Sequence, residues 1–236
     1  MTLPVGFQFS QSSLQAFETC PRRFKLHYLD RLHWPAVALE PLETVERLAR
    51  LGTEFHHLVH RRLVGQQAGL DVEALMADLA IVEPELQTWW RNYLTHYPPA
   101  PEQARLYPEL TVSTMLRGYR LLARFDLVAV EPDGAFLIVD WKTTQYQTAR
   151  AYLARRLQTR IYLYVLAAAG AALNGGQPIA PETIKLIYWY PQFPDQPEQF
   201  DYDHDQFQRD EQFLLALIER VEQAAARQDF PRVADS

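Results

Sequence analysis

The chain has 236 residues, 48% of them hydrophobic, which is enough to bury the core of one large domain. Its formal net charge of −6 argues against a protein that coats nucleic acid through bulk electrostatics, so a polyanionic partner would need a local basic lining. The single Cys20 excludes an internal disulfide framework, and by itself it cannot supply a thiolate zinc site or an iron–sulfur cluster.

The first hundred residues are predicted to be mainly helical. "SSLQAF" begins with the Ser12-x-x-Gln15 pattern of a capping box, and Pro21 is expected to interrupt that helix before "RRFKLHYLDRL" resumes one. Apolar positions then recur at helical spacing over 43 to 64 and 71 to 95. No stretch approaches eighteen apolar residues, and the N-terminus lacks a signal-peptide pattern, so we expect no membrane span and a cytoplasmic location.

The hydrophobic period changes after the Pro-rich segment 96 to 101. Three sequential strands are predicted at 106 to 116, 119 to 130 and 135 to 143. A long helix over 148 to 170 ends at Gly170, a fourth strand covers 183 to 190 after it, and an amphipathic helix covers about 204 to 228. This order predicts an α/β (mixed α+β) fold, a mixed sheet flanked by helices. We expect one domain over 1 to 236, with a mainly helical part at 1 to 100 and a sheet core with the C-terminal helix at 101 to 236.

The turn "EPDG" at 131 to 134 sets the geometry of the second hairpin. Pro, Asp and Gly at its second, third and fourth positions favour a type I turn followed by a left-handed glycine, a three-residue loop that pairs Glu131 with Ala135. Counting outward, opposed residues sum to 266, so Asp126 is expected opposite Asp140 and Arg124 opposite Lys142, all on one face. A loop of even length would place Asp140 on the other face.

Two opposed carboxylates repel each other unless a positive charge lies between them. At a β-carbon separation of roughly 5 Å both could bind one hard cation, and Lys142, one pleat further along, could orient a water or stabilise charge on a phosphate oxygen. The alternative is a structural Asp–Lys salt bridge at a sheet end. That alternative predicts no binding of Mn²⁺, whereas a site predicts binding.

"VDWKTT" after a hairpin that carries Asp126 resembles motifs II and III of the PD-(D/E)XK nucleases, especially the RecB-type branch. "GTEFHHLVH" (52 to 60) resembles the G-x-x-x-H element of that branch, and "QTRIYLYVLA" (158 to 167) its Q-x-x-x-Y motif. "SSLQAFETCPRRFKLHYL" (12 to 29) is similar to its N-terminal opening. The resemblance covers about residues 9 to 190 and implies a restriction-endonuclease-like core, αβββαβ, with an additional helical N-terminal region.

The resemblance also implies the site. His56, Asp126, Asp140 and the backbone carbonyl of Trp141 would hold Mg²⁺ or Mn²⁺, while Lys142, Gln158 and Tyr162 would complete the catalytic group. A His56–His60 pair at i and i+4 can also bind zinc, but His57 replaces the glutamate of H-E-x-x-H proteins. Glu109 in the first strand is a further candidate ligand. Several arginines could line a phosphate groove, namely Arg124, Arg155, Arg156 and Arg160.

Two positions depart from the family pattern. Phe125 stands where the family name has proline. Many relatives hold an iron–sulfur cluster through four cysteines, whereas Cys20 is alone here, so we expect no cluster and expect apolar packing to tie the N-terminal helices to the tail.

The expected activity is metal-dependent hydrolysis of DNA phosphodiesters, as an exonuclease in repair, recombination or defence, on single strands or duplex ends. The rival is a catalytically silent module of the same fold that binds nucleic acid or a helicase. No G-x-x-x-x-G-K-[ST] loop is present, so coupling to unwinding would need a helicase or other repair protein as partner. The sequence leaves the oligomeric state open.

Overall fold

The computed structural model describes residues 3–32, 42–71, 83–96 and 103–233. Helix α1 (Gln11–Thr19) ends before Pro21, which begins α2 (Pro21–Phe24) and leads into a π-helical turn (Lys25–Leu29). The capping box lies two residues earlier than predicted. Ser10 accepts from the Ser13 amide and Ser13 contacts the Ser10 amide, because strand β1 (Gln8–Ser10) delivers Ser10 to the helix in an extended conformation.

Two longer helices follow in the chain and precede strand β2 (Arg105–Pro108). Helix α3 (Leu42–Gln67) contains the predicted helix 43 to 64, and α5 (Pro84–His96) contains the second half of the predicted helix 71 to 95. The rest of that prediction, residues 72–82, lies outside the described residues. Within the described part of the chain, no helix combines the length and apolarity that a bilayer crossing needs.

The strands form two sheets rather than one. A five-stranded mixed sheet has the order β2 (Arg105–Pro108), β5 (Leu127–Val130), β6 (Phe136–Trp141), β7 (Ile184–Trp189) and β8 (Glu198–Asp201), and only β6 and β7 are parallel. A three-stranded sheet has the order β1, β4 (Tyr119–Arg124) and β3 (Thr111–Leu116). β1 and β8, the two edge strands that the sequence analysis did not predict, are only 3 and 4 residues long.

The predicted strands 106 to 116 and 119 to 130 are each split between the two sheets. The pairing register between the two predicted strands is the same in both sheets, since Pro108 pairs with Leu127 in one sheet and Thr111 with Arg124 in the other. Between them the backbone bends at Glu109, whose φ is +52°, while the Glu109 amide still donates to the Asp126 carbonyl over 2.9 Å and the Phe125 amide to Leu110. A single bent hairpin therefore passes from one sheet into the other.

The EPDG turn has the predicted three-residue loop. The Glu131 amide donates to the Ala135 carbonyl over 2.8 Å, and Gly134 adopts φ +90°, which a residue with a β-carbon rarely takes. The ladder beyond it pairs Leu127 with Val139, so the predicted sum of 266 is confirmed. The odd loop length thus fixes which side chains of β6 share a face.

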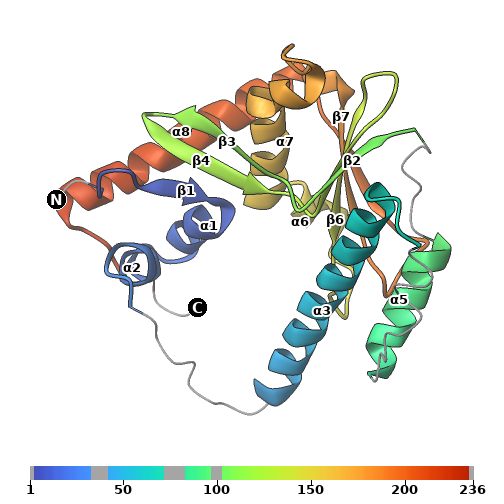
Figure 1. Cartoon of the computed structure of the whole chain (residues 1–236). Coiled ribbons are helices and arrows are strands. Elements are labelled where there is room, and N and C mark those ends of the chain that lie inside the picture. The colour runs from blue at the N-terminus through green and yellow to red at the C-terminus, as the bar shows by residue number, and fades with distance from the viewer. Residues whose placement is uncertain (1–2, 33–41, 72–82, 97–102, 234–236) are drawn as a thin grey trace.

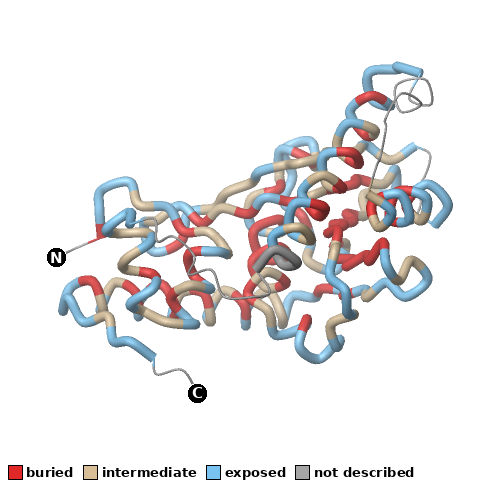
Figure 2. The backbone as a smooth tube through the Cα atoms, turned by 90° about the horizontal axis from the view of Figure 1, so that it is seen from below, coloured by how far each residue is buried: buried red, intermediate tan, exposed pale blue. Residues whose placement is uncertain are grey.

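Helices cover both faces of the five-stranded sheet (Figure 1). On one face, Phe136 and Ile138 pack with α7 (Leu157–Ala169) and α8 (His204–Arg227), and on the other, Leu137 and Val139 pack with α3 and α5. Figure 2 shows the buried segments gathered along the middle of the molecule. The mixed α/β architecture with flanking helices is the predicted fold class.

The predicted helix 148 to 170 is also divided. The short α6 (Arg150–Leu153) ends before α7, which terminates at Gly170 as predicted and continues as a 3₁₀ turn (Gly170–Asn174). A second 3₁₀ turn (Pro181–Thr183) precedes β7. The break between α6 and α7 leaves Gln158 in the first turn of α7, close to the end of β6.

The N-terminal helices are tied to the described part of the C-terminal tail. The Phe24 ring stacks on Phe230 with centroids 6.3 Å apart, and the Arg22 amide donates to the Pro231 carbonyl over 3.3 Å. The apolar connection that was predicted in place of a cluster is therefore present.

Candidate active site

Asp140 lies near the end of β6 and is buried, with 2% of its surface exposed. Because strand side chains alternate, it lies on the same face as Phe136 and Ile138, toward α7. Burial raises the pKa of Asp140; the Lys142 ammonium lowers it in part, and the charge of Asp126 raises it again. The net result is a pKa above the ordinary range, as expected of a carboxylate that is removed from water and lies near a second carboxylate.

Lys142 and Gln158 close around Asp140. Lys142 Nζ lies 2.6 Å from Asp140 Oδ2 and donates to Gln158 Oε1 over 2.8 Å, while Gln158 Nε2 donates to Asp140 Oδ1 over 2.6 Å. The ammonium also lies 4.9 Å from the centre of the Tyr188 ring. Three mutual contacts therefore fix the orientation of the lysine and the carboxylate.

Tyr162 extends this network to the bend of the hairpin. Its hydroxyl accepts from Gln158 Nε2 over 3.1 Å and donates to the Arg124 carbonyl over 2.6 Å. Burial, together with Asp140 and Asp126, raises the pKa of Tyr162 well above its ordinary value, so the hydroxyl keeps its proton. Tyr162 thus holds the backbone at the point where β4 ends and the chain enters Asp126.

His56 reaches the same point from α3, on the other side of the sheet. Its Nδ1 lies 3.3 Å from Asp126 Oδ1 and its Nε2 3.1 Å from the Trp141 carbonyl, while the Trp141 amide donates to Asp126 Oδ2 over 2.9 Å. Burial lowers the pKa of His56, but the hydrogen bond and charge of Asp126 outweigh it and the pKa is raised. Two acceptors facing both ring nitrogens favour the doubly protonated ring when no cation is bound, and a cation would bind the neutral ring and release a proton.

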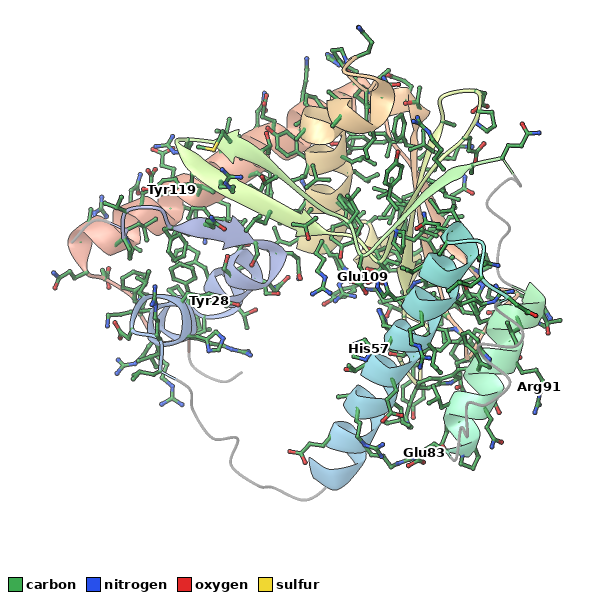
Figure 3. The ribbon with its side chains drawn as sticks, viewed as in Figure 1. Tyr28, His57, Glu83, Arg91, Glu109 and Tyr119 are labelled. Atoms are coloured by element: carbon green, nitrogen blue, oxygen red, sulfur yellow. The ribbon has the colours of Figure 1, made fainter. Side chains whose placement is uncertain are left out.

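Glu109 joins this group because of the bent hairpin, and Figure 3 shows it where the strands of the two sheets meet near α3. The "RG" turn at 117 and 118 pairs Leu116 with Tyr119, so opposed residues sum to 235 and Glu109 faces Asp126. The same count can be made from the sequence alone, and it places Glu109 beside Asp126 as a stronger candidate for a metal ligand. Its carboxylate is held by Arg124, whose Nε lies 2.8 Å from Oε2.

Arg124 therefore does not lie opposite Lys142 as predicted. The prediction was wrong because the chain changes sheet between β4 and β5: Arg124 belongs to the three-stranded sheet, where it pairs with Thr111. The Lys142 amide bonds to the Trp189 carbonyl of β7 over 2.8 Å. The ladder between β5 and β6 ends at Leu127, so Asp126 meets the backbone of Trp141 rather than forming a ladder pair with Asp140.

The other three arginines predicted to bind substrate have different surroundings. Arg156 lines the cavity around Asp140, with its guanidinium 5.9 Å from the centre of the exposed Tyr152 ring. Arg155 is exposed in the turn between α6 and α7. Arg160 points to α8, where it donates to Asp210 over 3.0 Å and packs on Phe213. The geometry brings Arg156 to the site and directs Arg160 away from it.

The residues present fit a divalent cation. Ligand atoms of His56, Glu109 and Asp126 all lie within 4.8 Å of one another, the one such histidine–carboxylate group of three among the described residues. Asp140, with its raised pKa, lines the same 360 Å³ cavity as His56 and Asp126, and the Trp141 carbonyl faces His56. Carboxylate and carbonyl oxygens with one imidazole suit Mg²⁺ or Mn²⁺.

The sequence of this chain matches the model of the PD-(D/E)XK nuclease superfamily over residues 8–234. A candidate exonuclease from Eubacterium rectale, known from a crystal structure, is similar in fold, with 9% identity, a TM-score of 0.52 and coverage of 95% of this chain and 83% of that chain. The crystal structure of SSO0001 is less similar, with 14% identity, a TM-score of 0.38 and coverage of 91% and 74%. A comparison with curated proteins finds no match.

Proposed function

Since the chain belongs to the PD-(D/E)XK nuclease superfamily, we propose that it is a divalent-metal-dependent deoxyribonuclease. His56, Asp126, Asp140 and the Trp141 carbonyl would hold Mg²⁺ or Mn²⁺, with Glu109 as a further ligand. The observation that carries the proposal is the Asp140–Lys142–Gln158 group beside the histidine–carboxylate group, within one open cavity. When bound, the ion would supply Lewis-acid chemistry, by lowering the pKa of a water and by stabilising negative charge on the phosphate.

The side chains have distinct proposed roles. Lys142, held by Asp140 and Gln158, places its ammonium beside the attacking water or a phosphate oxygen, where a fixed positive charge stabilises the transition state. Gln158 fixes both partners, and Tyr162 holds the Gln158 amide and the hairpin bend in place. Arg156, at the cavity wall, is placed to contact a phosphate of the substrate.

We further propose exonuclease action. The support is the fold shared with the candidate exonuclease from Eubacterium rectale. We also propose a role in repair, recombination or defence, with a helicase or another repair protein as partner.

The test uses the purified chain with end-labelled single-stranded and duplex DNA, with Mn²⁺, with Mg²⁺ and with a chelator. We expect cleavage that requires the metal and releases label as mononucleotides or short products from an end. Asp140→Asn, which keeps the size of the side chain, should abolish cleavage, and Lys185→Ala, at an exposed position near the start of β7, should not. Cleavage that survives in Asp140→Asn would overturn the assignment.

A calorimetric titration separates the rival functions. Binding of Mn²⁺ without cleavage would favour the catalytically silent module, which binds nucleic acid or a helicase. Absence of Mn²⁺ binding would leave only a structural salt-bridge network around Asp140 and Lys142.

A further inference from the structure

Three cavities share lining residues and so lie in a row from the candidate site to the N-terminal helices; we call this row the trough. The first, about 360 Å³, surrounds Asp140 and Lys142. It shares four lining residues with the second, of about 740 Å³, which are His56, Asp126, Thr143 and Tyr162. The second shares Gln11 and Ser12 with the third, of about 830 Å³, which lies between α1, α2 and the tail.

The far end of the trough is basic in a chain whose net charge is −6. The third cavity is lined by Arg22, Arg23 and Arg232, and no aspartate or glutamate is among its lining residues. Arg22 and Arg23 are exposed, and neither forms an ion pair with another residue in the described part of the chain. By contrast, Arg47 and Arg50 of α3 are both neutralised by glutamates. Arg22 and Arg23 therefore present positive charge that no ion pair with a described residue neutralises.

The elements that join the two ends limit the length of the trough. Ser10 pairs with Leu122, four residues before Asp126, a span of roughly 13 Å in a strand. Helix α1 has 9 residues, roughly 14 Å, and Arg22 follows shortly after it. With the roughly 5 Å between paired strands and the three residues from Thr19 to Arg22 added, the arginines lie at most about 40 Å from Asp126. At the roughly 3.4 Å spacing of stacked nucleotides, this corresponds to a run of several nucleotides.

The walls of the trough suit a single strand. Each cavity has about the volume that one small ligand fills, so a row of such cavities matches a single strand better than a duplex. Tyr28 lines the third cavity, and Figure 3 shows it in the N-terminal unit, across from His57 on α3, which lines the second cavity. An aromatic ring beside guanidinium groups is the usual means of holding single-stranded nucleic acid without sequence preference.

We infer that a single nucleic-acid strand lies along this trough, with one phosphodiester at Asp126 and Asp140 and a phosphate several nucleotides away on Arg22 and Arg23. The inference rests on the proposed function. Arginine side chains bind phosphate oxygens through two parallel hydrogen bonds, so the pair acts as an anchor for the strand. The anchor binds strands long enough to reach it and leaves the chemistry at the metal unaffected.

The test measures binding of fluorescein-labelled oligothymidylates by anisotropy in an Asp140→Asn background, where the strand stays intact. Arg22→Ala/Arg23→Ala should weaken binding of a sixteen-nucleotide strand about tenfold and reduce the slope of log K against log salt by about 1.4, for two lost phosphate contacts. Binding of a four-nucleotide strand should change less than twofold. Arg22→Lys/Arg23→Lys, which keeps the charge, should retain most of the affinity.

Arg91→Ala/Lys185→Ala is the matched control, because it removes two exposed positive charges outside the trough, and Figure 3 shows Arg91 on the far helix α5. It should leave binding of both strands unchanged. Equal losses for the long and short strands, or equal losses in the control, would overturn the inference. So would a sixteen-base-pair duplex that binds more tightly than the single strand and depends on the same arginines.

A second measurement keeps the two proposals distinguishable. Hydrolysis of thymidine 5′-p-nitrophenyl phosphate reports the metal site without a strand, and the Arg22→Ala/Arg23→Ala enzyme should match the wild type on it. If the wild type cleaves neither this ester nor DNA, the proposed function fails. The binding assay would still show whether a single strand binds along the trough. If the wild type cleaves both and the variant cleaves long strands equally well at low concentration, the trough fails alone.

Discussion

Gly52 of α3 lies directly against Thr143, at the end of β6: a β-carbon at position 52 would come within 2.5 Å of Thr143 Oγ1. The missing side chain lets α3 approach the sheet closely enough for His56, one helical turn later, to reach Asp126 and the Trp141 carbonyl. The glycine of the G-x-x-x-H element therefore contributes to the site by allowing α3 to lie close to the end of β6.

Gly52→Ala should displace α3 and weaken Mn²⁺ binding by about tenfold, as loss of a supporting contact around a metal ligand commonly does. Isothermal titration calorimetry with Mn²⁺ measures the effect. Gly52→Ala/Thr143→Ala should restore affinity, because the remaining contact to the Thr143 β-carbon is an ordinary 3.5 Å. Failure of the double variant to recover, with Thr143→Ala alone harmless, would show that the close approach is not what positions His56.

Lys142→Ala should reduce the rate of DNA cleavage by about 10²- to 10³-fold, the usual cost of losing one preorganised charge at a reacting centre. Mn²⁺ affinity should not weaken, because the ammonium that neutralises Asp140 at 2.6 Å is removed and the carboxylate becomes more available. Single-turnover cleavage and calorimetry measure the two effects separately. A parallel loss of metal affinity and rate would instead mark Lys142 as a purely structural partner of Asp140.

Phe24 should contribute strongly to stability, since its ring is fully buried between Phe17 and Phe230. Phe24→Ala should lower the free energy of unfolding by about 3–5 kcal/mol, and Phe24→Leu by much less. Because we propose that residues 1 to 236 form one domain, urea unfolding followed by circular dichroism should show one transition in all three proteins. The purified protein should contain no iron. Two transitions, or retained stability in Phe24→Ala, would contradict the proposed coupling of the N-terminal helices to the tail.

Asp210 gives a prediction on pH. Burial raises the pKa of this carboxyl, although Gln206, Arg160 and Tyr202 contact it and lower the pKa in part. A folded pKa above the unfolded value of about 3.9 means that the folded state binds the proton more tightly. The wild type therefore loses stability as pH rises from about 4 through the folded pKa.

Asp210→Asn cannot titrate, so the difference in unfolding free energy, variant minus wild type, should increase between pH 4 and pH 7. Urea unfolding at the two pH values measures it, with Asp195→Asn as an exposed control. A difference that decreases with pH would mean that the ion pair with Arg160 outweighs burial and lowers the folded pKa.

Part of the candidate site follows from local chemistry that is written in the sequence. The EPDG loop sets the 266 register, which places Asp140 on the α7 face with Ile138, and the "RG" turn in the same way places Glu109 opposite Asp126. Helical periodicity likewise predicts α3, α7 and α8, and with them the faces that carry His56 and Gln158. Turn length and periodicity depend on a few neighbouring residues, so they can be counted without knowing the fold.

What remained was decided by contacts between distant segments. The hairpin bends at Glu109 and Phe125 because its β3–β4 half joins β1 and its β2–β5 half joins β6. This bend carries Arg124 away from Lys142. Arg160 turns to Asp210 because α8 packs against α7. The approach of Gly52 to Thr143 depends on how α3 docks on the sheet. Turn lengths and hydrophobic periods are enough to assign side chains to a face. Which of those side chains meet depends on the fold, because strand partners and helix docking are set by competition for burial across the whole chain.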